Sequence, residues 1–122
     1  MDYARRILVF DDDPSMLTIM RYILEEASWE IMTAAKCNEA VHIITEFKPS
    51  VILMDNKIPD YGGVYAIRQI KQHSELQHIP VILFTANPNI AELAREAGAD
   101  AYLAKPFGLT QLYKIIDDFF IT

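Results

Sequence analysis

Three stretches of four consecutive apolar residues stand out along the chain, at residues 7–10, 51–54 and 81–84. Each of them runs directly into a polar residue. Continuous apolar runs of this length predict strands that are buried on both faces of a sheet. The middle run ends at Asp55, and a carboxylate is not left in a core without partners. We therefore expect Asp55 to lie at the carboxyl end of its strand, at the rim of the sheet.

Between these runs, apolar residues recur at helical spacing. The pattern predicts helices at residues 14–27, after Asn38 up to 47, and at 63–70, 89–97 and 108–120. It also predicts a shorter, less buried strand at 29–35 and a fifth strand at 101–104. Asp13 and Asn38 are predicted to cap the first two helices, and Gly98 to end the fourth. Strict alternation of strands and helices predicts an α/β fold with a five-stranded parallel sheet covered by helices on both faces.

The composition narrows the possible functions. With 122 residues, just over half of them apolar, the chain is expected to form one folded domain over residues 1–122. A net charge of −6 disfavours direct binding to nucleic acid. The single cysteine, Cys37, allows no internal disulfide, and no apolar run approaches a membrane span or a signal peptide. We expect a cytoplasmic protein that does not bind membranes.

Chemically active residues follow the four most clearly defined strands: Asp11, Asp12, Asp55, Thr85 and Lys105. Because the carboxyl ends of parallel strands share one edge, these side chains should converge. Three neighbouring carboxylates repel one another, and a hard divalent cation such as Mg²⁺ removes that penalty. One carboxylate can then act as a nucleophile toward a phosphoryl group, whose oxygens the lysine and the hydroxyl would bind.

These residues carry a resemblance to the receiver domain of two-component response regulators. It rests on residues 10–12, on Asp55 with Pro59 and Gly63 behind it, on residues 85–86 and on residues 105–107. The pieces occur in the family's order and span the whole chain. The resemblance implies a doubly wound, flavodoxin-like sheet of strand order 2-1-3-4-5 with five helices.

The resemblance also implies the chemistry. Asp55 would accept a phosphoryl group from a phosphohistidine of a sensor histidine kinase or of a relay protein. Mg²⁺ would be held by Asp12, by Asp55 and by the backbone carbonyl of Lys57, with Asp11 acting through water. The protein would be a phosphoacceptor that promotes its own phosphorylation and dephosphorylation, and no turnover enzyme on a separate substrate.

The resemblance also implies that the domain switches between two states when it is phosphorylated. Thr85 and Lys105 would contact the phosphoryl group, and Tyr102 matches an aromatic residue whose ring turns inward as the threonine moves. The Lys105–Pro106 bond matches a cis peptide of the family. A downstream protein would bind the face made by the fourth helix, the fifth strand and the fifth helix, and the domain would be a monomer or a phosphorylation-dependent dimer.

Some positions depart from the pattern of the receiver family, and others widen the apolar band of the last helix. Ile58 stands where methionine is usual, and Lys57 and Asn87 occupy two variable positions that affect the lifetime of the phosphoryl group. In the last helix, Leu109, Tyr113 and Phe120 widen the apolar band beyond one buried face, which fits either a docking surface or ordinary packing.

Other functions compete with this interpretation. The run of residues 11–15 also resembles the nucleophile motif of haloacid-dehalogenase-type phosphatases, in which Asp11 would be attacked, but no suitable late acidic cluster follows. A flavodoxin-like FMN carrier has the same fold, yet residues 11–13 would repel its phosphate. A receiver that is never phosphorylated, or one that is part of a longer protein, remains an alternative.

Overall fold

The computed structural model describes residues 5–58 and 62–119. Ten elements alternate along these residues: β1 (Arg6–Phe10), α1 (Pro14–Glu26), β2 (Glu30–Ala34), α2 (Ala40–Phe47), β3 (Val51–Asp55), α3 (Gly63–Gln72), β4 (Val81–Thr85), α4 (Ile90–Ala97), β5 (Ala101–Ala104) and α5 (Leu109–Asp117). All the strands run parallel, in the order β2-β1-β3-β4-β5. The predicted fold class and strand order are confirmed.

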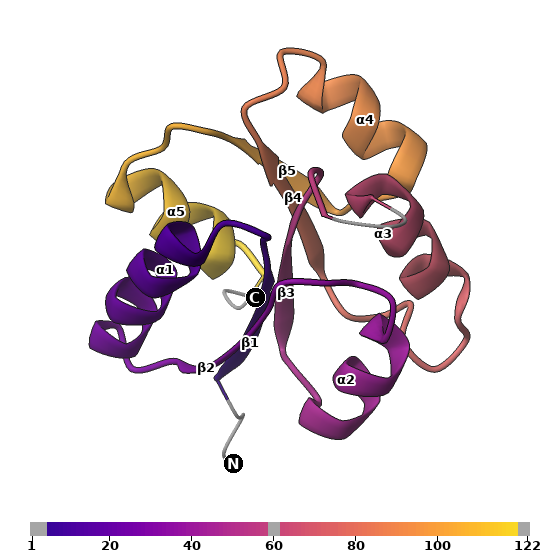
Figure 1. Cartoon of the computed structure of the whole chain (residues 1–122), viewed down its shortest axis with the longest axis horizontal. Helices are drawn as coiled ribbons and strands as arrows, with labels where there is room; N and C mark the ends of the chain where they lie inside the picture. Colours follow the sequence, from indigo (N-terminus) through magenta and orange to yellow (C-terminus); the bar gives the residue numbers. More distant parts are fainter. Residues whose placement is uncertain (1–4, 59–61, 120–122) are drawn as a thin grey trace.

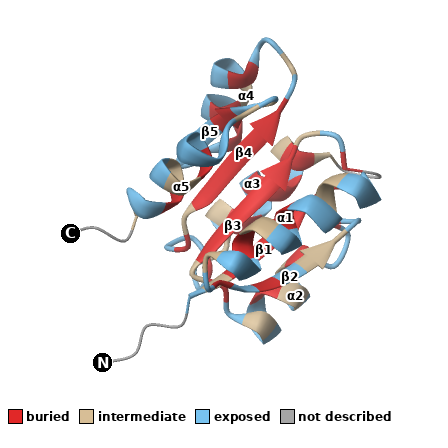
Figure 2. Cartoon of the chain, turned by 90° about the vertical axis from the view of Figure 1, so that its left-hand side faces the viewer, coloured by how far each residue is buried: buried red, intermediate tan, exposed pale blue. Residues whose placement is uncertain are grey.

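Three layers build the domain (Figure 1). Helices α1 and α5 cover one face of the sheet, and α2, α3 and α4 cover the other. Alternating strand residues divide between two cores: Phe10 and Met54 pack toward α2–α4, whereas Leu53 and Phe84 pack toward α1 and α5. Strands β3 and β4 are buried along their whole length and β1 is buried after Arg6, while the helices expose their outer faces (Figure 2).

Most predicted boundaries are confirmed within a residue or two. Asp13 caps α1, its side chain accepting a hydrogen bond from the Ser15 amide, with Pro14 in the first turn. Gly98 ends the short α4 in the left-handed conformation, at φ 78°. The last helix ends at Asp117, and the predicted Phe120 lies outside the described residues.

The second strand begins one residue later than predicted, and one predicted helix cap was wrong. The second strand begins at Glu30, because the Trp29 amide donates to the Leu24 carbonyl and so still belongs to the end of α1. Asn38 does not cap α2: Glu39 occupies the N-cap position without a side-chain hydrogen bond, and a backbone turn from the Ala40 amide to the Cys37 carbonyl precedes the helix.

Of the helices in residues 5–58 and 62–119, none is both long and apolar enough to cross a membrane.

Candidate functional site: an acidic cluster at the carboxyl edge of the sheet

Two neighbouring strands, β1 and β3, bring the acidic cluster together. Asp55 is the last residue of the central strand β3, and Asp11 and Asp12 follow β1, its neighbour in the sheet. One carboxylate oxygen from each of Asp11, Asp12 and Asp55 lies within 4.8 Å of the others. Asp11 and Asp55 are 1% and 4% exposed, whereas Asp12 faces solvent. The convergence predicted from the strand ends is therefore present.

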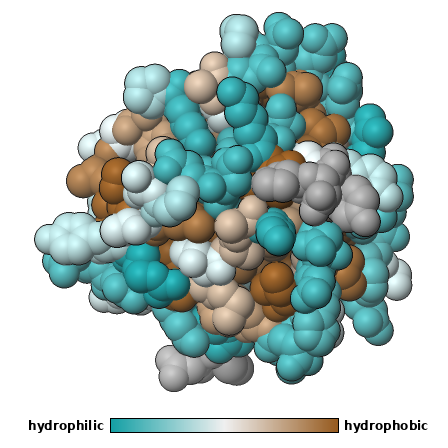
Figure 3. Space-filling model, in the orientation of Figure 1, coloured by the Kyte–Doolittle hydropathy of each residue, from teal (hydrophilic) through white to brown (hydrophobic). Residues whose placement is uncertain are grey.

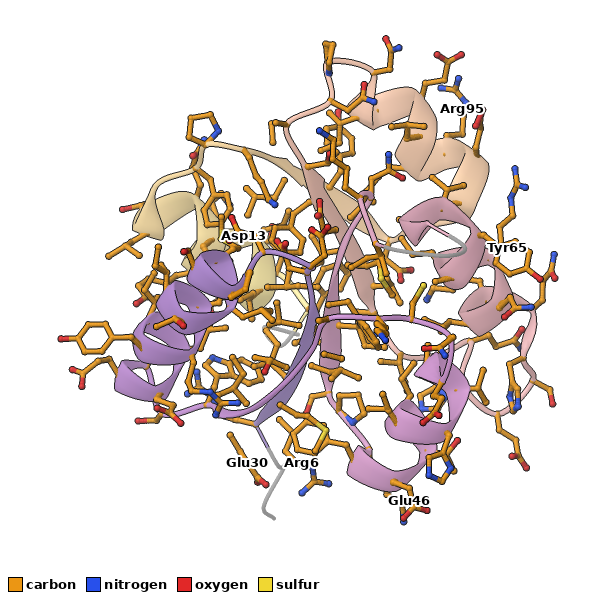
Figure 4. All side chains as sticks on the ribbon, viewed as in Figure 1. Arg6, Asp13, Glu30, Glu46, Tyr65 and Arg95 are labelled. Atoms are coloured by element: carbon orange, nitrogen blue, oxygen red, sulfur yellow. The ribbon has the colours of Figure 1, made fainter. Side chains whose placement is uncertain are left out.

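Asp11 is held on both of its oxygens. Oδ1 accepts a hydrogen bond from the Asp13 amide at 2.9 Å, and Oδ2 accepts one from the Lys105 ammonium at 2.9 Å. Figure 4 labels Asp13 at the start of α1, next to this edge of the sheet. The loop that starts α1 thus also fixes the orientation of the Asp11 carboxylate.

Lys105 bridges two carboxylates. Its Nζ lies 2.9 Å from Asp11 Oδ2 and 3.5 Å from Asp55 Oδ1, with a side chain that is only 18% exposed. The peptide bond to Pro106 is cis, as the resemblance implied, and the Lys105 amide donates to the Thr85 carbonyl. Lys105 therefore enters the site from the end of β5, across β4.

The carboxyl group of Asp55 has a pKa that is shifted from its ordinary value. Burial raises its pKa above the ordinary value of 3.8, and the negative charge of Asp11 raises it further. The Lys105 ammonium and a hydrogen bond from the Lys57 backbone act in the opposite direction without cancelling the rise. One lysine thus does not neutralise the cluster, which leaves room for a further cation.

Gly63 allows α3 to start close against the end of β3. A Cβ at this position would lie 2.3 Å from the Asp55 carbonyl oxygen, closer than side-chain carbons approach backbone atoms. The Gly63 amide donates to the Asn56 carbonyl at 3.0 Å. Of the sequence signals near Asp55, Gly63 is thus explained by sterics, whereas Pro59 lies outside the described residues.

Thr85 and Tyr102 belong to the next two strands of the sheet, β4 and β5. Thr85 ends β4 and is 1% exposed, and its hydroxyl accepts a hydrogen bond from the Asn87 amide at 3.3 Å. Tyr102, on the edge strand β5, is 48% exposed. The two residues are on neighbouring strands, Thr85 buried and Tyr102 half exposed.

One contact was missed by the sequence analysis. Phe84, treated there only as a core residue, places its ring beneath the Lys105 ammonium, 4.6 Å from ring centroid to Nζ. The only sequence signal was an aromatic residue directly before Thr85 in a buried strand, which also suits ordinary packing.

Comparison with known proteins gives the class of protein that this fold and site define. Residues 7–117 match the response regulator receiver domain family, and the chain belongs to that family. It is thus a receiver domain of the kind used in two-component signalling, a family of phosphoacceptors.

Individual relatives agree with that assignment. The phosphate regulon transcriptional regulatory protein PhoB of Escherichia coli K12 is 33% identical over 111 residues, which are 89% of this chain and 48% of PhoB. The chain thus spans about half the length of the curated relatives that it matches.

Solved structures agree as well. The receiver domain of the sensor histidine kinase PA1611 from Pseudomonas aeruginosa PAO1, which has a magnesium ion in its active site cleft, superposes with a TM-score of 0.87 at 28% identity, covering 96% of this chain and 98% of that one. A receiver domain protein from Clostridium thermocellum gives 0.84 at 31% identity, covering 96% and 94%.

Proposed function

We propose that residues 1–122 form a single receiver domain that works as a phosphorylation switch, with Asp55 as the phosphoacceptor. The observation that carries this proposal is the position of Asp55: it is buried at the rim of the sheet, shares the Lys105 ammonium with Asp11, and has a raised pKa. The donor would be a phosphohistidine of a sensor histidine kinase or of a phosphotransfer protein.

The chain's own groups would carry the transfer. A carboxylate oxygen of Asp55 attacks phosphorus, an O–P bond forms, and the P–N bond to the donor imidazole breaks with its electron pair returning to nitrogen. The Lys105 ammonium, 3.5 Å from Asp55 Oδ1, donates to one phosphoryl oxygen, and the Thr85 hydroxyl donates to another. The domain would promote its own phosphorylation and dephosphorylation and turn over no separate substrate.

The carboxylates fit Mg²⁺. Their oxygens lie within 4.8 Å of one another, are hard ligands, and face a single ammonium. We propose that Asp12, Asp55 and the Lys57 backbone carbonyl would hold Mg²⁺, with Asp11 assisting, and that the ion would offset the negative charge of the carboxylates and of the incoming phosphoryl group. The magnesium of the Pseudomonas relative supports this choice of metal.

We propose that the signal leaves through the α4–β5–α5 face. Phosphorylation would draw the Thr85 hydroxyl from its bond with the Asn87 amide, and the Tyr102 ring would turn inward. Beside Tyr102 lies a groove of about 480 Å³ lined by side chains of α4 and α5, including Arg95, which Figure 4 shows on the outer surface of α4. A downstream protein, or a second copy in a phosphorylation-dependent dimer, would read this face.

The phosphodonor would approach from another side. A groove of about 360 Å³ lies between α1 and the segment after β5, and both Ile19 and Lys105 line it. Figure 3 shows hydrophobic residues reaching the surface on that side of the molecule, over α1 and α5. Because Lys105 lines this groove and lies 3.5 Å from Asp55, a helix carrying a phosphohistidine and docked there would bring its phosphoryl group close to Asp55.

The remaining expectations stay part of the proposal. The net charge of −6 supports a protein partner over nucleic acid or an anionic membrane surface. The only cysteine of the sequence forms no disulfide within the chain, which fits the cytoplasm.

The test is phosphorylation in solution. The protein is incubated with acetyl phosphate and Mg²⁺, and its intact mass is measured with and without EDTA. We expect the mass of one phosphoryl group to be added to the wild type and to be absent from Asp55→Asn. Phosphorylation that survives in Asp55→Asn but is lost in Asp11→Asn would instead support the phosphatase-like alternative.

A further inference from the structure

The aromatic ring of Phe84 is the third partner of Lys105. Nζ lies 4.6 Å from the ring centroid, within the distance at which an ammonium is attracted by the negative face of a ring. Phe84 is fully buried and the Lys105 side chain is 18% exposed, so little water screens the contact. An attraction of this kind is stronger where the cation is desolvated.

The ring is held in place by the sheet and by a second aromatic residue. Phe84 is the partner of Asp55 in the register between β3 and β4, so ring and acceptor belong to one row of the sheet. Phe107 packs its ring edge-on against Phe84, with centroids 6.4 Å apart and an interplanar angle of 65°. A ring fixed in this way can orient a flexible lysine.

The distances show why orientation matters. Lys105 Nζ lies closer to Asp11, at 2.9 Å, than to Asp55, at 3.5 Å. Asp11 thus draws the ammonium away from the acceptor, and the ring gives it a second attraction from below. An aliphatic side chain would fill the same space without attracting the cation.

We propose that Phe84 is a positioning residue for Lys105: the face of its ring holds the ammonium between the two carboxylates, where it can bind the phosphoryl group on Asp55. This inference rests on the proposed function of Asp55. The contact itself exists without a phosphoryl group, so it can be tested separately.

The first experiment is a double-mutant cycle on stability in EDTA. Unfolding in urea is measured for Phe84→Leu, for Lys105→Met and for the double variant. The matched control is Phe10→Leu with Lys105→Met, because Phe10 is equally buried, directly precedes Asp11, and packs on the opposite face of the sheet. We expect a coupling of about three- to tenfold in the unfolding equilibrium constant for Phe84 and less than about twofold for Phe10. Equal coupling for the two phenylalanines would overturn the proposal.

The second experiment changes the electrostatics of the ring and keeps its shape. Incorporating 3,4,5-trifluorophenylalanine at position 84 weakens the negative ring face, and the same replacement at position 10 is the control. We expect the rate of phosphorylation by acetyl phosphate to fall about three- to tenfold for position 84 only. Equal rates for the two would overturn the proposal. If even the unmodified protein takes up no phosphoryl group, the proposed function fails, while the double-mutant cycle still decides whether Phe84 holds Lys105.

Discussion

The domain has a lysine–aspartate cluster at each edge of its sheet, and the two differ in how well their charges are matched. At the amino edge, Lys71 Nζ lies 2.6 Å from Asp100 and donates to the carbonyls of Ile79 and Gln77. Asp100 in turn accepts from the Val81 amide at 2.8 Å. One cation meets one anion, and all three protons of the ammonium have an acceptor.

The carboxyl edge is built differently. There one ammonium faces Asp11, Asp12 and Asp55, and the pKa of Asp55 is raised because burial and like charge are not fully offset. Matched charges tie loops together, whereas an excess of one sign attracts a ligand of the other. The amino edge therefore has the balanced charge of a structural cluster, whereas the carboxyl edge has the excess negative charge expected of the metal site proposed above.

The largest expected difference between the edges is in phosphorylation. Asp11→Asn removes a carboxylate from the cluster while keeping its size, and we expect the rate with acetyl phosphate and Mg²⁺ to fall about a hundredfold or more. Asp100→Asn, at the amino edge, should leave the rate within about twofold. Rates are followed by intact mass over time, and equal losses in both variants would show that the comparison is wrong.

The free energy of unfolding should respond in the opposite way, with a clear loss when the cluster at the amino edge is disrupted. Lys71→Met leaves two backbone carbonyls and Asp100 without their donor, and we expect it to lower the free energy of unfolding by about 2 kcal/mol, discounted because Asp100 is partly exposed. Urea unfolding measures this. The control is Lys114→Met, because Lys114 forms an exposed pair with Asp118 at 3.7 Å, and it should cost less than about 0.5 kcal/mol.

The addition of Mg²⁺ should also distinguish variants at the two edges of the sheet. We expect Mg²⁺ at about ten times its dissociation constant to raise the free energy of unfolding by about 1.4 kcal/mol, a rise of a few degrees in melting temperature. The rise should persist in Asp100→Asn and disappear in Asp12→Asn, which removes a proposed direct ligand of the ion. A rise of the same size in all three proteins would mean that the ion binds elsewhere.

Removing the negative charge of Asp55 should stabilise the metal-free domain. Asp55→Asn relieves the repulsion with Asp11, and we expect a gain of about 1 kcal/mol at neutral pH in EDTA, reduced by the lost attraction to Lys105. At the other edge, Asp100→Asn should destabilise, since it weakens a matched pair. A loss of stability in Asp55→Asn would indicate that Lys105 already balances the cluster.

The gain in the free energy of unfolding expected for Asp55→Asn should depend on pH. Because the folded-state pKa of Asp55 is raised above 3.8, the folded protein binds the proton more tightly than the unfolded chain, so the stability contributed by this group is fully present below pH 3.8 and is lost as pH rises through the folded pKa. We therefore expect the difference between Asp55→Asn and wild type to be smallest at low pH and to grow above that value. Urea unfolding in EDTA at several pH values measures it, and a difference independent of pH would contradict the raised pKa.

The sequence predicted the carboxyl edge better than the amino edge for a physical reason. Asp55, Thr85 and Lys105 each follow an apolar run, and parallel strands carry such ends to one place, so local pattern was enough. The pair of Lys71 and Asp100 joins the end of a helix to a loop 29 positions away, and no local pattern marks it. The predicted cap at Asn38 failed because a backbone turn supplies what its side chain would have supplied.

The place of β3 in the sheet has a further consequence for how a signal can travel. Two strands flank β3 on each side, so its amides should be among the slowest in the domain to exchange with deuterium. Tyr102 belongs to β5, the last strand of the sheet formed by the described residues 5–58 and 62–119. Such an edge strand should open far more often than β3. Asp55, the proposed acceptor, therefore lies on the strand expected to be the most rigid, whereas the exposed Tyr102 lies on a strand expected to rearrange at low energetic cost.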